Sequence, residues 1–205
     1  MESMLREALR KHNGLRQQLD NMLLGEEGDV VEAELKKFVT MRPCWTRKKE
    51  NSFLRDLFVE ETISIGKTFG NETLTNDGKP FARVDSDFKN WGLIHDYHAT
   101  KEVKVKVAEL VKNGTFKEIF GAFGENLNRL SFTVPQVKKF VEENANKLLD
   151  NGCGNFFLVK DGGKFFVANV NRYDDGWSVF VRGFSDGSVW GAEHRYRFMS
   201  PQLKP

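Results

Sequence analysis

The stretch that decides the fold is residues 156–199, FFLVKDGGKFFVANVNRYDDGWSVFVRGFSDGSVWGAEHRYRFM. It holds four apolar runs, and the turns between them are Asp161-Gly162-Gly163, Tyr173-Asp174-Asp175-Gly176 and Ser185-Asp186-Gly187-Ser188. Short runs rich in Val and aromatic residues, separated by Asp/Gly turns at near-even spacing, are typical of antiparallel strands. We therefore predict a four-stranded antiparallel meander, with Val189–Met199 as its last strand.

A helix is expected directly before this meander. Thr133 and Gln136 have the spacing of a capping box, and Gly152 marks a helix end. The side chains on one face are apolar: Val137, Phe140, Val141 and Leu148. A helix covering one side of an antiparallel sheet makes an α+β fold. We predict a unit of residues 131–205, preceded by a helical and mixed region of residues 1–130.

Residues 100–130 contain two further predicted elements. Thr115 and Glu118 form a second capping box, and the helix that follows ends at Gly124. Its apolar residues Phe116, Ile119, Phe120 and Phe123 follow helical spacing. Residues 100–113 fit a helix capped by Thr100, but the alternation from Val103 to Val107 fits a strand equally well.

Along residues 57–85 the side-chain pattern repeats every two residues, which predicts strands. Asp77-Gly78 suits a tight hairpin turn, and Pro80 suggests an edge position because proline cannot donate to a strand ladder. We expect a three-stranded antiparallel piece here, with Phe81, Val84 and Phe88 facing inward. Residues 41–56 are expected to form a connector.

The N-terminal segment has the pattern of a helical hairpin. The first stripe is Leu5, Ala8, His12, Leu15, Leu19 and Met22. After a turn at residues 25–28, Asp29 begins a second helix whose stripe is Val31, Leu35, Phe38 and Val39. The helices are expected to pack on each other and on the core. The alternative is a homodimer seam through Leu5, Leu15, Leu19 and Met22.

Composition excludes several classes of protein. The 205 residues include 18 Phe, four Trp and three Tyr, enough for a sizeable core and unlike a disordered chain. The net charge is only +2. Most nucleic-acid-binding domains have a strong excess of basic residues gathered in a patch, and this chain has no such excess. No apolar run reaches membrane-span length, and residues 1–24 lack the apolar core of a signal peptide. With only two Cys, we expect a cytoplasmic protein with no membrane contact.

Four segments of the C-terminal third together resemble a module of uncharacterised bacterial hypothetical proteins. The segments are Phe156–Lys160, Phe165–Ala168, Val189–Arg197 and Pro201–Leu203. The resemblance implies that residues 131–203 form a unit. It implies no activity, so it carries no catalytic residue and no cofactor to this chain.

Two groups of residues could carry chemistry. His95 and His98 are three apart and could meet on one helical face, but a catalytic zinc needs three protein ligands. Cys153 follows a predicted helix C-terminus, where the helix dipole raises a thiol pKa. His194 could approach this Cys through the sheet. We expect no catalytic residue, no metal site and no cofactor.

The end of the predicted meander is the candidate binding surface. On a final strand, alternation would place Glu193, Arg195 and Arg197 on one face. Arginines with interleaved aromatics can stack bases or bind anions. The alternative is a solvent-exposed face with no ligand, on which these arginines form cross-strand ion pairs with Asp174, Asp175 or Asp186. The expected binding residues are Arg172, Arg182, Trp190, Arg195, Tyr196 and Arg197.

These observations favour a non-enzymatic protein-interaction or binding module whose partner is unknown. One alternative is a weak nucleic-acid-binding protein that uses the arginine and aromatic face. The other alternative is a metal-dependent hydrolase that uses His95 and His98.

Overall fold

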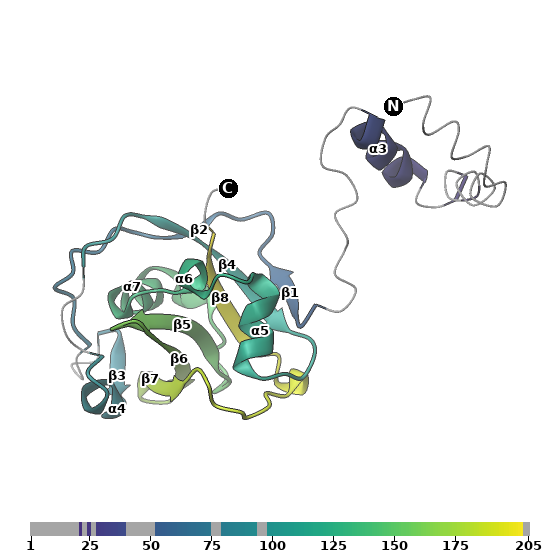
Figure 1. Ribbon diagram of the computed structural model, residues 1–205. Helices are drawn as coiled ribbons and strands as arrows, with labels where there is room; N and C mark the ends of the chain where they lie inside the picture. Colours follow the sequence, from purple (N-terminus) through teal and green to yellow (C-terminus); the bar gives the residue numbers. More distant parts are fainter. Residues whose placement is uncertain are drawn as a thin grey trace. The chain divides into compact units, whose positions relative to one another are not determined.

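The computed structural model describes residues 21, 24–25, 28–39, 52–74, 79–93 and 98–202. The chain divides into two compact units, residues 1–50 and residues 51–205, and each is described by itself (Figure 1). The first unit contains the helix α3, Gly28–Val39, which confirms the predicted second N-terminal helix. The first predicted helix and its homodimer seam lie almost wholly outside the described residues. No helix in the described ranges has the length and apolarity needed to cross a membrane.

The second unit alternates short strands and helices before its long C-terminal strands. Its strands are β1 Leu54–Leu57, β2 Ile63–Ile65, β3 Phe81–Val84, β4 Val103–Leu110, β5 Asn155–Asp161, β6 Lys164–Tyr173, β7 Gly176–Gly183 and β8 Arg197–Gln202. Its helices are α4 Asp87–Asn90, α5 Phe116–Phe123, α6 Leu127–Leu130 and α7 Val134–Asn144. Two short 3₁₀ turns are η1 Ala145–Lys147 and η2 Ala192–His194.

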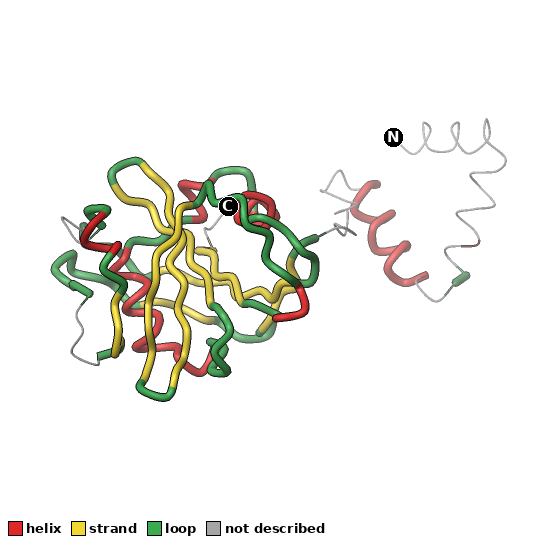
Figure 2. The backbone as a smooth tube through the Cα atoms, turned by 90° about the horizontal axis from the view of Figure 1, so that it is seen from below, coloured by secondary structure: helices red, strands yellow, loops and turns green. Residues whose placement is uncertain are grey.

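All the described strands join one mixed sheet in the order β1-β4-β8-β5-β6-β7-β3, with β2 also paired to β4. Figure 2 shows the strands running together through the centre of this unit, flanked by helices. The β5–β8 and β3–β7 pairs are parallel, and the other pairs are antiparallel. The α+β class is therefore confirmed, while the expectation of a purely antiparallel sheet is wrong.

The predicted fourth strand of the meander is the main error in the expected topology. β5, β6 and β7 do form an antiparallel meander, as predicted. Residues 184–196 then leave the sheet, and Arg195 has a left-handed backbone with φ 52°. β8 begins only at Arg197 and lies between β4 and β5, not beside β7. The alternation assumed across Glu193, Arg195 and Arg197 is broken, because only Arg197 is in a strand.

Residues 54–85 also pair differently from the prediction. β1 and β2 both pair with β4, and β3 pairs in parallel with β7, so the described residues of this segment do not form a three-stranded piece of their own. β1 occupies part of the expected connector. β3 does lie at the sheet edge, and Phe81 and Phe88 are buried as predicted, while Val84 is half-buried. Turn residues 75–78 are outside the described ranges.

The compact units divide at residue 50, whereas the sequence suggested a division at residue 130. The difference arises because β4 pairs with β8, which places residues 103–110 and 197–202 side by side in the sheet. The ambiguous segment 100–113 is this strand. Residues of this strand are buried on both faces of the sheet. Val105 and Val107 belong to the core layer that contains α7, and Ala108 and Leu110 belong to the core layer that contains α5.

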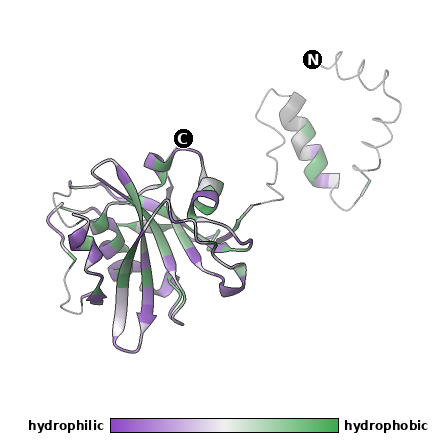
Figure 3. Ribbon diagram, turned by 60° about the horizontal axis from the view of Figure 1, so that its bottom comes forward, coloured by the Kyte–Doolittle hydropathy of each residue, from purple (hydrophilic) through white to green (hydrophobic). Residues whose placement is uncertain are grey.

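The core has two layers, one on each face of the sheet. The α7 face buries Phe140 and Val137 of the helix against Phe157, Val170 and Met199 of the strands. The α5 face is built from aromatic residues, and its buried members include Phe116, Phe120, Phe156 and Phe198. Figure 3 shows hydrophobic colour concentrated along the middle of the strands, with hydrophilic colour toward their ends. The strand ends are therefore where polar groups reach the surface.

Both predicted capping boxes are present. Thr115 and Glu118 cap α5, and Thr133 and Gln136 cap α7, each with reciprocal backbone hydrogen bonds. Helix α7 ends at Asn144 and not near Gly152 as predicted. The cause lies downstream, where the Asn155 side chain binds both the N–H and the C=O of Leu149 and holds that segment extended.

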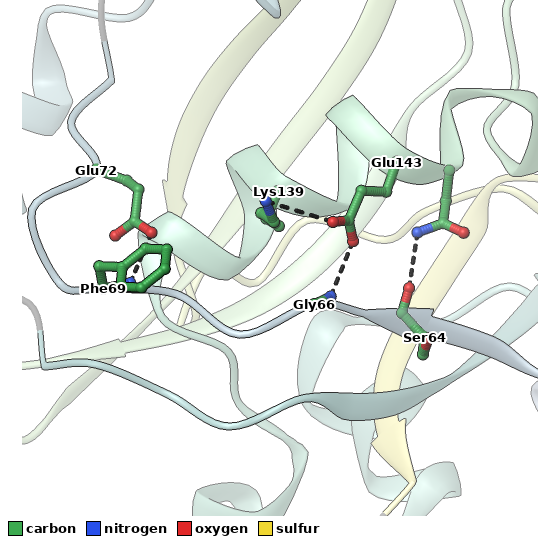
Figure 4. A network of polar contacts seen from close by, with 7 residues as sticks. Ser64, Gly66, Phe69, Glu72, Lys139 and Glu143 are labelled. Atoms are coloured by element: carbon green, nitrogen blue, oxygen red, sulfur yellow. Dashed lines mark hydrogen bonds and ion pairs between the residues drawn. The ribbon is translucent and has the colours of Figure 1, made fainter.

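Polar contacts attach β2 and the segment after it to helix α7 (Figure 4). The Glu143 carboxylate accepts the Gly66 N–H at 2.8 Å, and Asn144 donates to the Ser64 carbonyl at 2.9 Å. Farther along, Glu72 accepts the N–H groups of Phe69 and Gly70. Burial alone would raise the pKa of Glu72, but these donors lower it below its usual value. This segment is thus ordered by backbone groups that bind carboxylates.

Candidate functional site

A hollow of about 430 Å³ opens over the second half of β6 and the neighbouring part of β7, on the α5 face. We call it the aromatic hollow. From the strands it is lined by Phe156, Asn169, Asn171, Tyr173, Phe180 and Arg182. Two neighbouring segments complete it with Gly152, Cys153 and Gly154 on one side, and Trp190, His194 and Tyr196 on the other. Its volume falls in the range of small-molecule sites, roughly 300–1,000 Å³.

Strand alternation explains why this part of the sheet is polar. Along β6, Ala168 and Val170 belong to the α7 face, so Asn169 and Asn171 take the opposite face. Asn171 pairs across the strands with Ser178, and Asn169 pairs with Phe180. Closer to the start of β6 the same face carries Val167, which is buried in the aromatic core. The face therefore changes from apolar to polar as β6 leaves the core.

The polar atoms here are buried without being satisfied. Asn169 and Asn171 are each only 8% exposed, and Ser178 is fully buried. The atoms Asn169 Oδ1, Asn171 Oδ1, Ser178 Oγ and Trp190 Nε1 have no hydrogen-bond partner among the described residues. An unsatisfied buried polar group costs about 1–3 kcal/mol. Three of these four atoms belong to residues that line the aromatic hollow.

The segment 150–154 forms one rim of the hollow and is held by amide side chains. Asn155, fully buried, accepts the Leu149 N–H at 2.8 Å and donates to the carbonyls of Leu149 and Val170. Asn171 donates through Nδ2 to the Gly152 carbonyl at 2.9 Å. This bond fixes the orientation of the Asn171 amide and leaves its Oδ1 as the acceptor.

Aromatic rings form the opposite wall. The Trp190 ring lies 4.6 Å from Phe156 and 5.4 Å from Tyr196, in edge-to-face contacts. The His194 ring lies 5.1 Å from the ring of Tyr196. Backbone hydrogen bonds between Trp190 and Gly114 attach this wall to the segment before α5. The wall is thus built on the aromatic core and does not depend on the meander alone.

Two basic side chains of the hollow have carboxylates beside them. The lining contains Arg182 and His194 and no Asp or Glu, but Glu193 Oε1 lies 3.5 Å from His194 Nε2, and Asp186 lies close enough to Arg182 for their charges to interact. Burial raises the pKa of the Tyr196 phenol above its usual value, and the nearby Cys153 and Glu193 raise it further. Tyr196 therefore remains a neutral hydroxyl at physiological pH.

The structure brings together three of the six predicted binding residues: Arg182, Trp190 and Tyr196. Arg172 is on the opposite face of β6, with its guanidinium 5.4 Å from the centroid of the Trp177 ring. Arg195 is exposed outside the strands. Arg197 is half-buried, donates to the Lys147 carbonyl and lies over Phe58. The predicted arginine face therefore does not form as one surface.

Sequence reasoning missed the two asparagines. Their signal is visible in the strand 164–173, where Asn occupies alternate positions within an apolar run. Asn is depleted in strands because it packs poorly on a pleated, half-buried surface. Two on one face of a strand indicate a site that needs amide groups.

Two other hollows have fewer features that indicate a binding site. A hollow of about 730 Å³ lies between the β1–β2 connection and the α5–α6 corner, and one of about 740 Å³ is lined by Arg83, Arg172 and Asp150 among others. No unsatisfied buried atom belongs to the described lining of either. Cys153 and His194 do line one hollow, although no contact is found between them in the described structure.

The predicted histidine pair is only partly described, because His95 lies outside the described residues. Among the residues that are described, no group of three or more possible ligands is placed to hold a metal ion. No family model, no curated protein and no solved structure matches this chain.

Proposed function

We propose that this protein is a non-enzymatic binding module that takes a small polar ligand, or a polar group of a larger partner, into the aromatic hollow. The observation that carries the proposal is that Asn169, Asn171 and Trp190 all line one hollow, and that each of them has a buried polar atom without a hydrogen-bond partner among the described residues. A ligand that bonds to these atoms removes their desolvation cost and gains affinity from it.

Preorganisation supports the same proposal. Asn171 is held by Gly152, and Trp190 is held by Phe156 and the Gly114 backbone, so these groups lose little freedom on binding. A concave site with aromatic walls and a few convergent polar groups is the usual form of a ligand pocket.

The nucleic-acid alternative has less support. Its four arginines occupy separate places, and only Arg182 lines the hollow. Binding along a strand of nucleic acid would need several phosphate contacts on one surface. The hydrolase alternative rests on His95, which is not described.

The test is a ligand panel read by nuclear magnetic resonance on the full chain. Ribonucleoside monophosphates, hexoses and N-acetyl amino-acid amides are each added at about 10 mM, enough to detect a Kd near 1 mM. The readout is the indole N–H resonance of Trp190. At least one class is expected to shift it.

Two variants make this test specific. Asn169→Val removes an unsatisfied acceptor without removing a described hydrogen bond, so the variant is expected to fold and to lose the response. Arg172→Ala lies on the same strand but on the other face, and it is expected to respond like the wild type. The proposal fails if no class moves the Trp190 resonance, or if Asn169→Val responds unchanged.

A further inference from the structure

The rim of the aromatic hollow contains an Asn-Gly pair in an exposed bend. Asn151 and Gly152 are both exposed, and Gly152 has a left-handed backbone with φ 84°. A Cβ on Gly152 would meet nothing within 4 Å. An Asn side chain can close a succinimide ring on the nitrogen of the next residue, and glycine hinders this approach least because it has no Cβ. The pair therefore has both the residue types and the open space that ring closure needs.

One hydrogen bond prepares the Asn151 side chain for this reaction. Its Oδ1 accepts the backbone N–H of Cys153 at 3.1 Å. The bond holds the side chain against the backbone, since the loop of atoms that it closes contains both Asn151 Cγ and the Gly152 nitrogen. A backbone N–H donor also stabilises the oxyanion that forms when a carbonyl is attacked. Among the described residues no group accepts the Gly152 N–H, so no hydrogen bond holds the attacking nitrogen.

A second Asn-Gly pair of the described chain provides a contrast. Asn113 and Gly114 precede α5, and Gly114 is buried. The Gly114 N–H donates to the Trp190 carbonyl at 3.2 Å, and the Gly114 carbonyl accepts the Trp190 N–H at 2.8 Å. Asn113 Oδ1 accepts the N–H of Ala192, which is distant in sequence. Ring closure at this pair therefore requires local opening of the structure first.

We propose that Asn151 is a site of spontaneous deamidation, with water as the only co-reactant. Asn is among the thermolabile residues of proteins. The Gly152 nitrogen attacks Asn151 Cγ, a bond forms between these two atoms, and the bond from Cγ to the side-chain nitrogen breaks. That nitrogen leaves as ammonia and takes the proton of the Gly152 N–H.

Water then opens the succinimide ring in one of two ways. Addition at Cγ restores the ordinary backbone and leaves an aspartate in place of the asparagine. Addition at the main-chain carbonyl carbon of Asn151 leaves an iso-aspartate, in which the backbone runs through the former side chain. Neither route involves an oxidation or a reduction, and neither requires the ligand of the proposed function.

The iso-aspartyl product changes the rim of the hollow. The Gly152 carbonyl accepts Asn171 Nδ2 at 2.9 Å, and the Asn155 side chain binds the N–H and the carbonyl of Leu149. These bonds fix the segment on both sides of Asn151. An iso-aspartyl link lengthens that segment by one backbone carbon and adds a negative charge. The segment then cannot keep the Asn155 bonds and the Asn171 bond in their present geometry.

The experiment follows the folded full chain by peptide mass spectrometry during incubation at neutral and mildly alkaline pH. The exchange of a side-chain NH₂ for OH marks deamidation, and fragmentation of the peptides locates it. Asn151 is expected to react at least about tenfold faster than Asn113, because the Gly114 pairing must open first. In urea this pairing is absent, so the two rates are expected to become equal. A higher pH is expected to accelerate the reaction, since the Gly152 nitrogen must lose its proton.

Two matched variants test the assignment to Asn151. A Gln side chain is longer by one methylene and closes a ring on the next nitrogen far more slowly. Asn151→Gln is therefore expected to abolish the fast reaction at this position, while Asn113→Gln leaves it unchanged. The Asn13-Gly14 pair lies outside the described residues and is measured as a separate peptide. Equal rates at Asn151 and Asn113 in the folded protein would overturn the proposal.

The effect on the rim is measured by nuclear magnetic resonance of the Asn171 side-chain amide. The incubated protein, which contains iso-aspartate, is expected to shift this resonance. Freshly purified Asn151→Asp adds the charge without lengthening the backbone, and it is expected to shift the resonance less. An unchanged Asn171 resonance in the iso-aspartyl protein would contradict the effect on the rim. The ligand panel is a separate measurement, so its failure would overturn the proposed function and leave the deamidation site standing.

Discussion

At the scale of the residue, two buried asparagines show the difference between an amide that supports the fold and one that supports a site. Asn155 satisfies backbone groups of Leu149 and Val170 and fixes the end of the helical segment. Asn169 has an unsatisfied Oδ1 in a hollow. In the sequence, Asn155 lies between Gly154 and Phe156 and Asn169 lies between Ala168 and Val170, and neither context shows whether the amide has partners. Only the hydrogen-bond partners distinguish them.

This difference predicts opposite changes in stability. Asn169→Val replaces an unsatisfied amide by a strand-forming side chain, and it is expected to raise the free energy of unfolding by roughly 1 kcal/mol. Asn155→Val removes three hydrogen bonds to the backbone groups of Leu149 and Val170, and it is expected to lower that free energy by about 3 kcal/mol. Urea unfolding of both variants measures the two values. A destabilised Asn169→Val would mean that the asparagine has a structural role.

Glycine 154 gives a second prediction at this scale. A Cβ there would stand 2.7 Å from Asn169 Oδ1 and 2.7 Å from the Phe156 ring, so Gly154→Ala must displace the rim or the ring. We expect a loss of about 1–3 kcal/mol of stability and a shifted Trp190 indole resonance. Gly183→Ala, where a Cβ would meet nothing within 4 Å, is the control and should be nearly neutral. Equal behaviour of the two variants would contradict the close packing of the rim.

The sequence alone could have predicted that Arg172 and Arg182 lie on opposite faces of the sheet. The two-residue turn Asp174-Asp175 sets Tyr173 opposite Gly176, and every pair across β6 and β7 then joins an odd-numbered and an even-numbered residue. Two even-numbered residues such as Arg172 and Arg182 must therefore face opposite ways. Arg197 could not be placed in this manner, because its strand lies several positions away in the sheet.

At the scale of the element, the two capping boxes are equivalent in geometry and different in charge. The box of α5 uses Glu118, whose carboxylate accepts the N–H and hydroxyl of Thr115. These bonds lower the pKa of Glu118 below its usual value of 4.5. The box of α7 uses Gln136, which does not titrate.

This contrast predicts a pH dependence. Because the pKa of Glu118 is lower in the folded protein, its contribution is present above the unfolded pKa near 4.5 and is lost as the pH falls through the folded pKa. Glu118→Gln should make the fall in stability between about pH 5 and about pH 3 shallower. Gln136→Glu should make it steeper. Urea unfolding across this range measures both, and parallel profiles for all three proteins would contradict the assignment.

Elements with local signals were predicted well, and their ends were not. The Thr/Glu and Thr/Gln spacings located α5 and α7 because a capping box involves only neighbouring residues. The end of α7 depends on Asn155 and on contacts with β2, which are distant in sequence. β4 was ambiguous because it is buried on both faces, so its apolar residues do not follow a single period.

At the scale of the whole molecule, residues 51–205 contain the entire described sheet, both core layers and the aromatic hollow. The fragment 51–205 is therefore expected to unfold cooperatively, with a Tm within about 2 °C of the full chain. Differential scanning calorimetry of both proteins measures this. A fragment without a cooperative transition would show that residues 1–50 are needed for the fold. Sedimentation of the same two proteins tests the homodimer seam through Leu5, Leu15, Leu19 and Met22, which stays a prediction.

The position of β8 has a consequence for how the protein is made. β8 joins β1, β2 and β4 on one side to β5, β6, β7 and β3 on the other. A ribosome releases β8 after all the other described strands, so the two groups of strands wait without their common neighbour. Pairing over such long separations is slow, and unpaired strand edges are prone to aggregate meanwhile. Synthesis rate and chaperone supply should therefore influence the yield of this protein more than its final stability does.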